Sequence, residues 1–232
     1  MENYKQLFAT PKDLMWKEEV ARGTRLLNKW GLSQSGESGD CSVRDLETGY
    51  MYISGSPDWC FQKNLRDARG WERWVTNKDS EDLVPWSTPT IEWPMHVAIY
   101  NAIPEAGAIC HTHGVWASVF AALRMDVPLE KAGEGLTGII PCSDYRPAGS
   151  PDVGEVVAAT MLQGYDWALM GNHGAVTYGA TLDEAFEKAM LMEHLCEKVY
   201  FQLLAEKHLG KLFGSNLQQR NGPGPAGRGR FR

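Results

Sequence analysis

Residues 106–114, AGAICHTHG, place two histidines one residue apart inside an apolar run. A short run of small and apolar residues bounded by glycines is typical of a buried β-strand. Side chains alternate between the faces of a strand, so His111 and His113 project from the same face, about 7 Å apart, while Cys110 points to the other face. Two imidazoles side by side indicate half of a metal site. The alternative is a pair of hydrogen-bonded histidines near a sheet edge.

A third histidine supplies a further candidate ligand. His173 follows the apolar segment DWALMGN and, like His113, precedes a glycine. Glu92 opens the helical pattern that leads into the histidine strand. Neutral imidazole and carboxylate are suitable ligands for Zn²⁺ or a similar divalent ion, and three or four of them complete a catalytic site with an open position.

The rest of the chain predicts a succession of helices and strands. Helical spacing of apolar residues predicts an amphipathic helix over residues 11–30, which Gly31 ends, and residues 36–56 predict a hairpin that turns at Gly49. Further helices are predicted over 90–103, 115–124, 150–164 and 181–208, and further strands over 106–114, 135–143 and 166–172. Because this alternation lacks the regularity of a parallel βαβ sheet, the pattern favours a mixed, layered α/β domain.

Several helix boundaries have local signals. Ser150 is a candidate N-cap followed by a proline, and Thr181 with Glu184 forms a capping-box pattern.

Residues 58–88 are polar and rich in tryptophan, and we predict an irregular excursion there that is functional or contacts a neighbouring subunit.

Composition and charge exclude several classes of function. The formal net charge of −6, from 23 basic and 29 acidic residues, argues against a nucleic-acid partner. No apolar run approaches about 18 residues and the N-terminus lacks an apolar signal core, so neither a membrane partner nor secretion is expected. The five cysteines are scattered without a CxxC pair, which indicates a reduced, cytoplasmic location. Residues 213–232 are predicted to be a flexible Gly/Pro/Arg-rich tail after one catalytic domain over residues 1–212.

Four segments resemble the class II aldolase/adducin family, which includes fuculose-phosphate aldolase and its relatives. They are SGDCSVRD, TIEWPMHVAIY, AICHTHG and LMGNHGAVTYGATLDEAFEKAMLMEHLCEKVY, and their order and spacing agree with the family over roughly residues 12–205. The resemblance implies a three-layer αβα sandwich around a mostly antiparallel central sheet. It also implies a homotetramer with C4 symmetry, with each site near a subunit interface.

The resemblance implies roles for individual residues as well. His111, His113 and His173 would hold Zn²⁺, with Mn²⁺ or another divalent metal as alternatives, and Glu92 would be the acid–base residue. The expected activity is that of a lyase acting through a metal-stabilised enediolate. Its substrate would be a short ketose or ketose phosphate, cleaved to a dihydroxyacetone-phosphate-like fragment and an aldehyde. The matching substrate-binding positions are Gly39, Asp40, Ser54, Ser56, Thr90 and Tyr145.

The chain departs from the family pattern at places that concern phosphate binding and proton donation. Asp40 stands where an asparagine is usual, and its charge opposes a phosphate by about 4 kcal/mol at ~4 Å and an effective dielectric constant of about 20. Ile91 stands where a hydroxyl is common. The tyrosine that donates a proton in the aldolases is missing before IPC, so Tyr145 or a C-terminal group replaces it, or the reaction differs. The candidate compensating cations are Arg44, Arg146 and Lys63.

These departures leave alternative functions open. A metal-dependent decarboxylase of a hydroxy- or aromatic carboxylic acid would suit the missing phosphate donors and the many tryptophans. Trp93 and Trp116 are candidate walls of such a pocket, or else core or subunit-contact residues. A sugar-phosphate dehydratase or epimerase, and a non-catalytic adducin-like interaction module, are further alternatives.

The remaining histidines and one cysteine have simpler interpretations. His96 lies four residues after Glu92 on the same predicted helix face, as a core residue or as a support for the site. Cys142 is interpreted as a core residue, and His194 and His208 as surface residues.

Overall fold

The structure is a computed structural model of the chain, and it describes residues 11–33, 38–55, 59–64, 72–75 and 89–213. An eight-stranded sheet lies at its centre, and neighbouring strands run antiparallel except the last pair. In spatial order the strands are β4 (Glu72–Val75), β3 (Trp59–Asn64), β2 (Tyr50–Ser54), β1 (Asp40–Asp45), β5 (Ala108–Thr112), β10 (Ala175–Gly179), β9 (Trp167–Met170) and β8 (Cys142–Ser143). A small second sheet pairs β6 (Val127–Pro128) with β7 (Ile139–Ile140).

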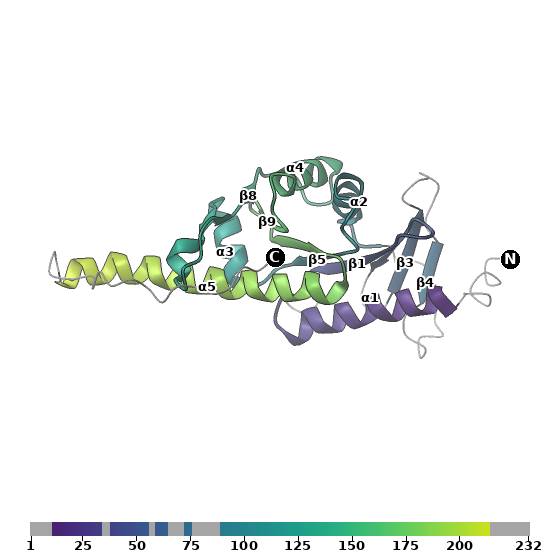
Figure 1. Cartoon of the computed structure of the whole chain (residues 1–232), viewed down its shortest axis with the longest axis horizontal. Coiled ribbons are helices and arrows are strands. Elements are labelled where there is room, and N and C mark those ends of the chain that lie inside the picture. The colour runs from purple at the N-terminus through teal and green to yellow at the C-terminus, as the bar shows by residue number, and fades with distance from the viewer. Residues whose placement is uncertain (1–10, 34–37, 56–58, 65–71, 76–88, 214–232) are drawn as a thin grey trace.

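Helices cover both faces of the central sheet (Figure 1). In the described part of the chain they are α1 (Pro11–Lys29), α2 (Trp93–Ala102), α3 (Val115–Leu123), α4 (Pro151–Met161) and α5 (Leu182–Phe213), with a short 3₁₀ helix η2 (Leu129–Ala132). Helices α2 and α4 lie on one face, and α1 with the first half of α5 lies on the other (Figure 1). The three-layer αβα sandwich with a mostly antiparallel sheet is therefore confirmed.

Each layer is held by its own apolar cluster. Ile99 of α2 and Val157 of α4 pack with Ile109 of β5 on one face, and all three are fully buried. Cys110, the next residue of the strand, packs with Leu27 and other residues of α1 and α5 on the opposite face, as strand alternation predicts. Burying one large apolar side chain contributes about 1.5–3 kcal/mol, so the two clusters fix β5 firmly between the helical layers.

A third cluster lies at the other end of the sheet. It joins Phe120 of α3 to Leu169 of β9 and Val199 of α5, all buried. Helix α5 therefore contacts two of the three clusters, and its second half extends past the sheet (Figure 1).

Most predicted elements are present, but the structure differs from the prediction in several places. Residues 59–64 and 72–75 form strands β3 and β4, which extend the sheet, so an irregular excursion over the whole of 58–88 was wrong. The strand predicted over 135–143 is divided by Pro141 into β7 and β8, which join different sheets because proline cannot donate a ladder hydrogen bond. Strands β6 and β10 and the 3₁₀ helix η2 were not predicted, and α5 continues past Gly210 to Phe213.

Two other predictions concern membrane spans and the C-terminal tail. No helix among the described residues is long and apolar enough to span a membrane. The boundary between residues 212 and 213 stays a prediction, because residues 214–232 lie outside the described part of the chain.

Candidate metal centre

Three histidines from two parts of the chain converge at one end of the central strands. His111 lies in β5, His113 follows that strand directly, and His173 lies in the turn between β9 and β10. One ring nitrogen from each lies within 4.8 Å of the others. The ring centroids are 4.7, 5.0 and 5.0 Å apart, and the Nε2 atoms of His111 and His113 are separated by 3.0 Å. Three converging imidazoles can share one tetrahedral cation and leave a position open for a substrate.

The backbone of two close-packed turns places these rings. The register pairs His111 with Asp40 of β1 and with Val176 of β10, so it occupies a central strand. Gly174 follows His173, and a Cβ there would lie 2.5 Å from the Thr112 carbonyl oxygen. Gly39, with φ +87°, would place a Cβ 3.0 Å from the His111 carbonyl oxygen. Glycine at both positions therefore lets the neighbouring chains approach the histidine strand.

The histidines are held in a form that can bind a cation. His111 Nδ1 donates to the Ala175 carbonyl oxygen at 2.9 Å, so its Nε2 carries the free lone pair. The pKa values of three histidines are each lowered to about 4, and burial is the largest cause in every case. They are His111, His113 and His173. These imidazoles are therefore neutral at pH 7, as metal ligands must be.

Glu92 lies beside this cluster at the start of α2. Its side chain is only 5% exposed, and its Oε1 lies 3.9 Å from His173 Nε2. The pKa of Glu92 is raised to about 7, first by burial and then by the negative charge of Asp40, against a backbone hydrogen bond from Gly149 that lowers it. Among the described residues, neither Glu92 Oε2 nor His173 Nδ1 has a hydrogen-bond partner, although both are buried. Unpaired polar atoms around converging lone pairs fit a divalent cation held at this position.

The pKa values predict how the metal-free protein responds to acid. The three histidines have folded pKa values below their ordinary value near 6.5, so the unfolded state binds more protons between about pH 6.5 and 4. We expect the free energy of unfolding to fall as the pH falls through this range, by at most ~1.4 kcal/mol per pH unit for each histidine. Glu92, whose pKa is raised, acts in the opposite direction and reduces the net slope.

Urea denaturation of the metal-free protein at pH 7, 5.5 and 4.5 measures this slope. The variant His173→Asn should show a shallower dependence, whereas His194→Asn, at an exposed position on α5, should match the wild type. A stability that does not change between pH 7 and 4.5 in the wild type would contradict neutral, buried histidines.

A buried chain of hydrogen bonds reaches Glu92 from the inside of the molecule. Asp40 accepts at Oδ2 from the Thr90 hydroxyl (2.6 Å) and at Oδ1 from His96 Nε2 (2.7 Å). His96 Nδ1 lies 2.7 Å from the Ser42 hydroxyl, which lies 2.9 Å from the Tyr100 hydroxyl. At the other end, the Glu92 amide donates to the Thr90 hydroxyl at 3.3 Å. The chain ties the backbone of Glu92 to the core between β1 and α2.

Sequence reasoning found only part of this chain. Asp40 and Thr90 were predicted as substrate-binding positions, and His96 was interpreted as a core residue or a support, but Ser42 and Tyr100 were missed. A signal was available in the spacing. Glu92, His96 and Tyr100 recur every four residues on one helix face, and Asp40 and Ser42 share one strand face.

Comparison with known proteins identifies the architecture around this centre. The family model described as Class II Aldolase and Adducin N-terminal domain matches residues 18–200. The chain belongs to the class II aldolase and adducin family. An L-fuculose phosphate aldolase of Methanococcus maripaludis is 33% identical over 166 residues, which cover 71% of this chain and 86% of that protein. A 5-methylthioribulose-1-phosphate/5-deoxyribulose-1-phosphate aldolase of Escherichia coli is 30% identical over 182 residues, with 78% and 81% covered.

Solved structures agree at the level of the fold. A sugar-phosphate aldolase from Thermotoga maritima superposes with a TM-score of 0.62 at 19% identity, covering 84% of this chain and 96% of that one. The family model and the named relatives make the chain an enzyme of the class II aldolase type, a metal-dependent carbon–carbon lyase.

The other substrate-binding candidates of this class II aldolase have different surroundings. Ser54 is buried and its hydroxyl accepts from the Cys41 amide at 3.1 Å. Tyr145 is 46% exposed in the loop after β8, and no contact given for the described residues joins its side chain to the histidines. Ser56 lies outside the described residues.

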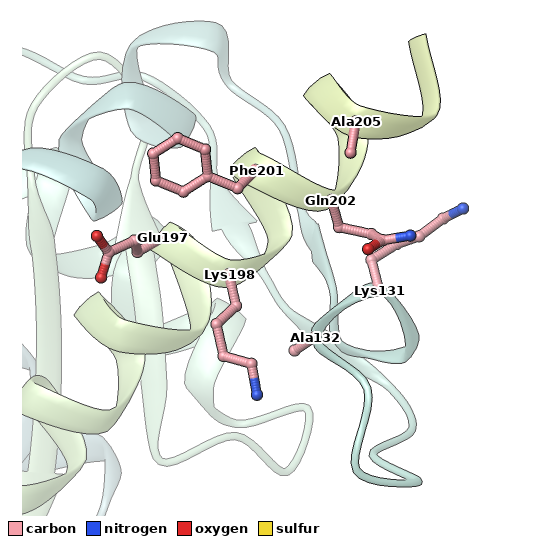
Figure 2. A pocket seen from close by; sticks show the side chains of 7 residues that line it. All are labelled: Lys131, Ala132, Glu197, Lys198, Phe201, Gln202 and Ala205. Atoms are coloured by element: carbon pink, nitrogen blue, oxygen red, sulfur yellow. The ribbon is translucent and has the colours of Figure 1, made fainter. Parts of the chain in front are cut away.

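Residues of the alternative interpretations have structural contacts. Trp93 packs against the cluster between α2 and α4, and the Trp116 ring lies 5.3 Å from those of Tyr200 and Phe201 on α5. Cys142 is partly buried against the third cluster, and His194 and His208 are exposed. A shallow pocket between η2 and α5 contains no residue of the metal centre (Figure 2). Its lining residues are Lys131, Ala132, Glu197, Lys198, Phe201, Gln202 and Ala205.

Glu193 of α5 supports the chain directly after the second histidine. Its carboxylate accepts from the backbone amides of Trp116 (2.8 Å) and Ala117 (2.9 Å), at the beginning of α3. We expect Glu193→Ala to lower the free energy of unfolding by about 1–2 kcal/mol, because two amides at a helix N-terminus lose their acceptor. Urea denaturation measures the change. The exposed Glu187→Ala on the same helix is the control, and equal effects of the two substitutions would contradict the capping role.

Proposed function

We propose that this enzyme cleaves and forms a carbon–carbon bond between a short ketose fragment and an aldehyde, with Zn²⁺ as its metal. The convergence of His111, His113 and His173 beside the buried carboxylate of Glu92 carries the proposal. A divalent ion bound there supplies a Lewis acid that stabilises negative charge on substrate oxygens. Mn²⁺ or another divalent ion would supply the same chemistry.

Glu92 is proposed to move the proton. Its pKa of about 7, raised first by burial, lets it hold or release a proton near neutral pH, which suits a general acid–base group. Its position at the N-terminus of α2 and the bond from its amide to Thr90 fix the backbone from which the carboxylate reaches the histidine cluster. Gly39, Asp40, Ser54, Ser56, Thr90 and Tyr145 remain the proposed substrate-binding residues.

Decarboxylation is the second candidate function. It is favoured by the side chain at position 91, because Ile91 is 68% exposed beside Glu92 and offers no hydrogen bond. The two reactions differ in their products. Metal-loaded enzyme given a panel of ketoses and ketose phosphates should release an aldehyde, detected by coupled reduction. Release of carbon dioxide from a hydroxy- or aromatic acid, with no aldehyde from any ketose, would instead establish a decarboxylase.

We also propose a cytoplasmic homotetramer. Large apolar side chains are exposed on α3 and α5, as expected where copies of the chain meet. They are Val115, Leu123, Leu191, Phe201, Leu204 and Leu209. Light scattering should give a mass of about four chains, and a monomer at micromolar concentration would contradict this assembly.

A further inference from the structure

Asp40 places a buried negative charge next to the catalytic carboxylate. The residue is 4% exposed, and both carboxylate oxygens already accept short hydrogen bonds. The Thr90 hydroxyl bridges the two acidic residues, since it donates to Asp40 and accepts from the amide of Glu92. Because a hydroxyl has one proton, Thr90 has no hydrogen left to donate to a substrate.

The surroundings contain little that would bind a phosphate group. Ile91 lacks a donor, and the Ser54 hydroxyl, which accepts from the Cys41 amide, belongs to a buried residue that is 3% exposed. Among the described cations, Arg44 donates to the carbonyl oxygens of Tyr100, Ile103 and Pro104, and Arg146 donates to that of Tyr145. The Arg44 guanidinium is therefore engaged with three backbone oxygens, and no hydrogen bond or ion pair among the described residues joins Arg44 or Arg146 to Asp40.

The relatives named above carry a phosphate in the names of their substrates. We propose that Asp40 is a specificity-determining residue that disfavours a phosphorylated substrate, so that this enzyme acts on a ketose fragment with a neutral, hydroxyl-bearing end. The inference rests on the proposed function for the reaction but concerns only the end of the substrate that is not cleaved. A fixed negative charge rejects an anionic ligand more strongly than it attracts a neutral one, which makes it a selective element.

The substitution Asp40→Asn removes the negative charge of this side chain with little change in its shape. Asparagine can accept from His96 Nε2 through Oδ1 and donate from Nδ2 to the Thr90 hydroxyl oxygen. The Thr90 hydrogen is then released to donate to a ligand, and one negative charge is removed. The matched control is Asp45→Asn, which neutralises a buried carboxylate at the other end of the same strand, where it accepts from Lys12, Thr48 and the Glu47 amide.

The first experiment compares dihydroxyacetone with dihydroxyacetone phosphate as ligands of the metal-loaded enzyme by calorimetry. We expect the wild type to bind the phosphate ester no more tightly than the neutral ketone. In Asp40→Asn the ratio of the two affinities should shift towards the phosphate ester by about 10-fold or more, with no shift in Asp45→Asn. A wild-type preference for the ester of about 10-fold or more, or an unchanged ratio in Asp40→Asn, would overturn the inference.

A second measurement does not depend on the proposed ketose. Sulfate, compared with chloride at equal ionic strength, is added to the metal-free proteins during thermal unfolding. Sulfate should raise the midpoint of Asp40→Asn more than those of the wild type and Asp45→Asn, because an anion can then bind beside Thr90. Equal shifts in the three proteins would sink the inference, whereas failure to release an aldehyde from any ketose would refute only the proposed function.

Discussion

Alanine in place of His111 or His173 should remove the bound metal and reduce the lyase activity by about 10³-fold or more, because a three-ligand site loses one ligand and the Lewis acid with it. His111 lies in β5 and His173 in the turn between β9 and β10, but both contribute to the same cluster of ring nitrogens. Metal analysis of the purified variants and their rates at saturating substrate measure the two effects. The expected metal content is well below one ion per chain in both.

The control for this prediction is His194→Ala, which removes an exposed histidine from α5. It should retain both metal and activity. A variant lacking His111 that contains no metal and keeps wild-type turnover would show that the reaction does not use this centre.

Glu92→Gln should separate catalysis from folding and from metal binding. The substitution keeps the shape of the side chain but cannot accept a proton, so we expect kcat to fall by about 10²–10⁴-fold while the metal stays bound. Binding of a substrate analogue should change much less than kcat. Equal losses of metal and activity would instead assign Glu92 to the ligand set.

The same variant should be more stable than the wild type when both are free of metal. The folded pKa of Glu92, about 7, lies above its ordinary value, so its ionisation opposes folding increasingly as the pH rises from about 4.5 to 7. Removing this group should increase the free energy of unfolding at pH 8 by about 1–2 kcal/mol, allowing for solvent screening. At pH 4, where the carboxyl is protonated in both states, the difference should vanish. A destabilised variant at pH 8 would contradict a buried carboxylate with a raised pKa.

Patterns of short range predicted much of the fold. The apolar run around His111 identified β5, and alternation correctly placed Cys110 on the face opposite the histidines. Proline and N-cap signals located the beginnings of α2 and α4, where the Ser150 hydroxyl accepts from the Val153 amide. Such features depend on neighbouring residues only, so one sequence contains them in full.

Features that depend on distant partners were not predicted. Strands β3 and β4 form because β2 offers an edge for pairing, which their tryptophan-rich sequence does not reveal. Asp40 was predicted as a substrate-binding position and as an obstacle to phosphate, not as a member of a hydrogen-bonded chain. The packing of β1 against α2 brings His96 to Asp40, where it donates a hydrogen bond to the carboxylate. The same packing adds Ser42 and Tyr100 to the hydrogen-bonded chain.

The most direct test is to titrate Zn²⁺ into enzyme stripped of metal and to follow bound zinc and aldehyde release in the same samples. If the histidine cluster is the catalytic centre, activity should rise in proportion to bound zinc and reach its maximum at one ion per chain, and His173→Ala should show neither. Two results would contradict a catalytic role for the histidine cluster. One is full activity in the metal-free enzyme, and the other is zinc that binds without restoring the enzyme's activity towards any ketose tested.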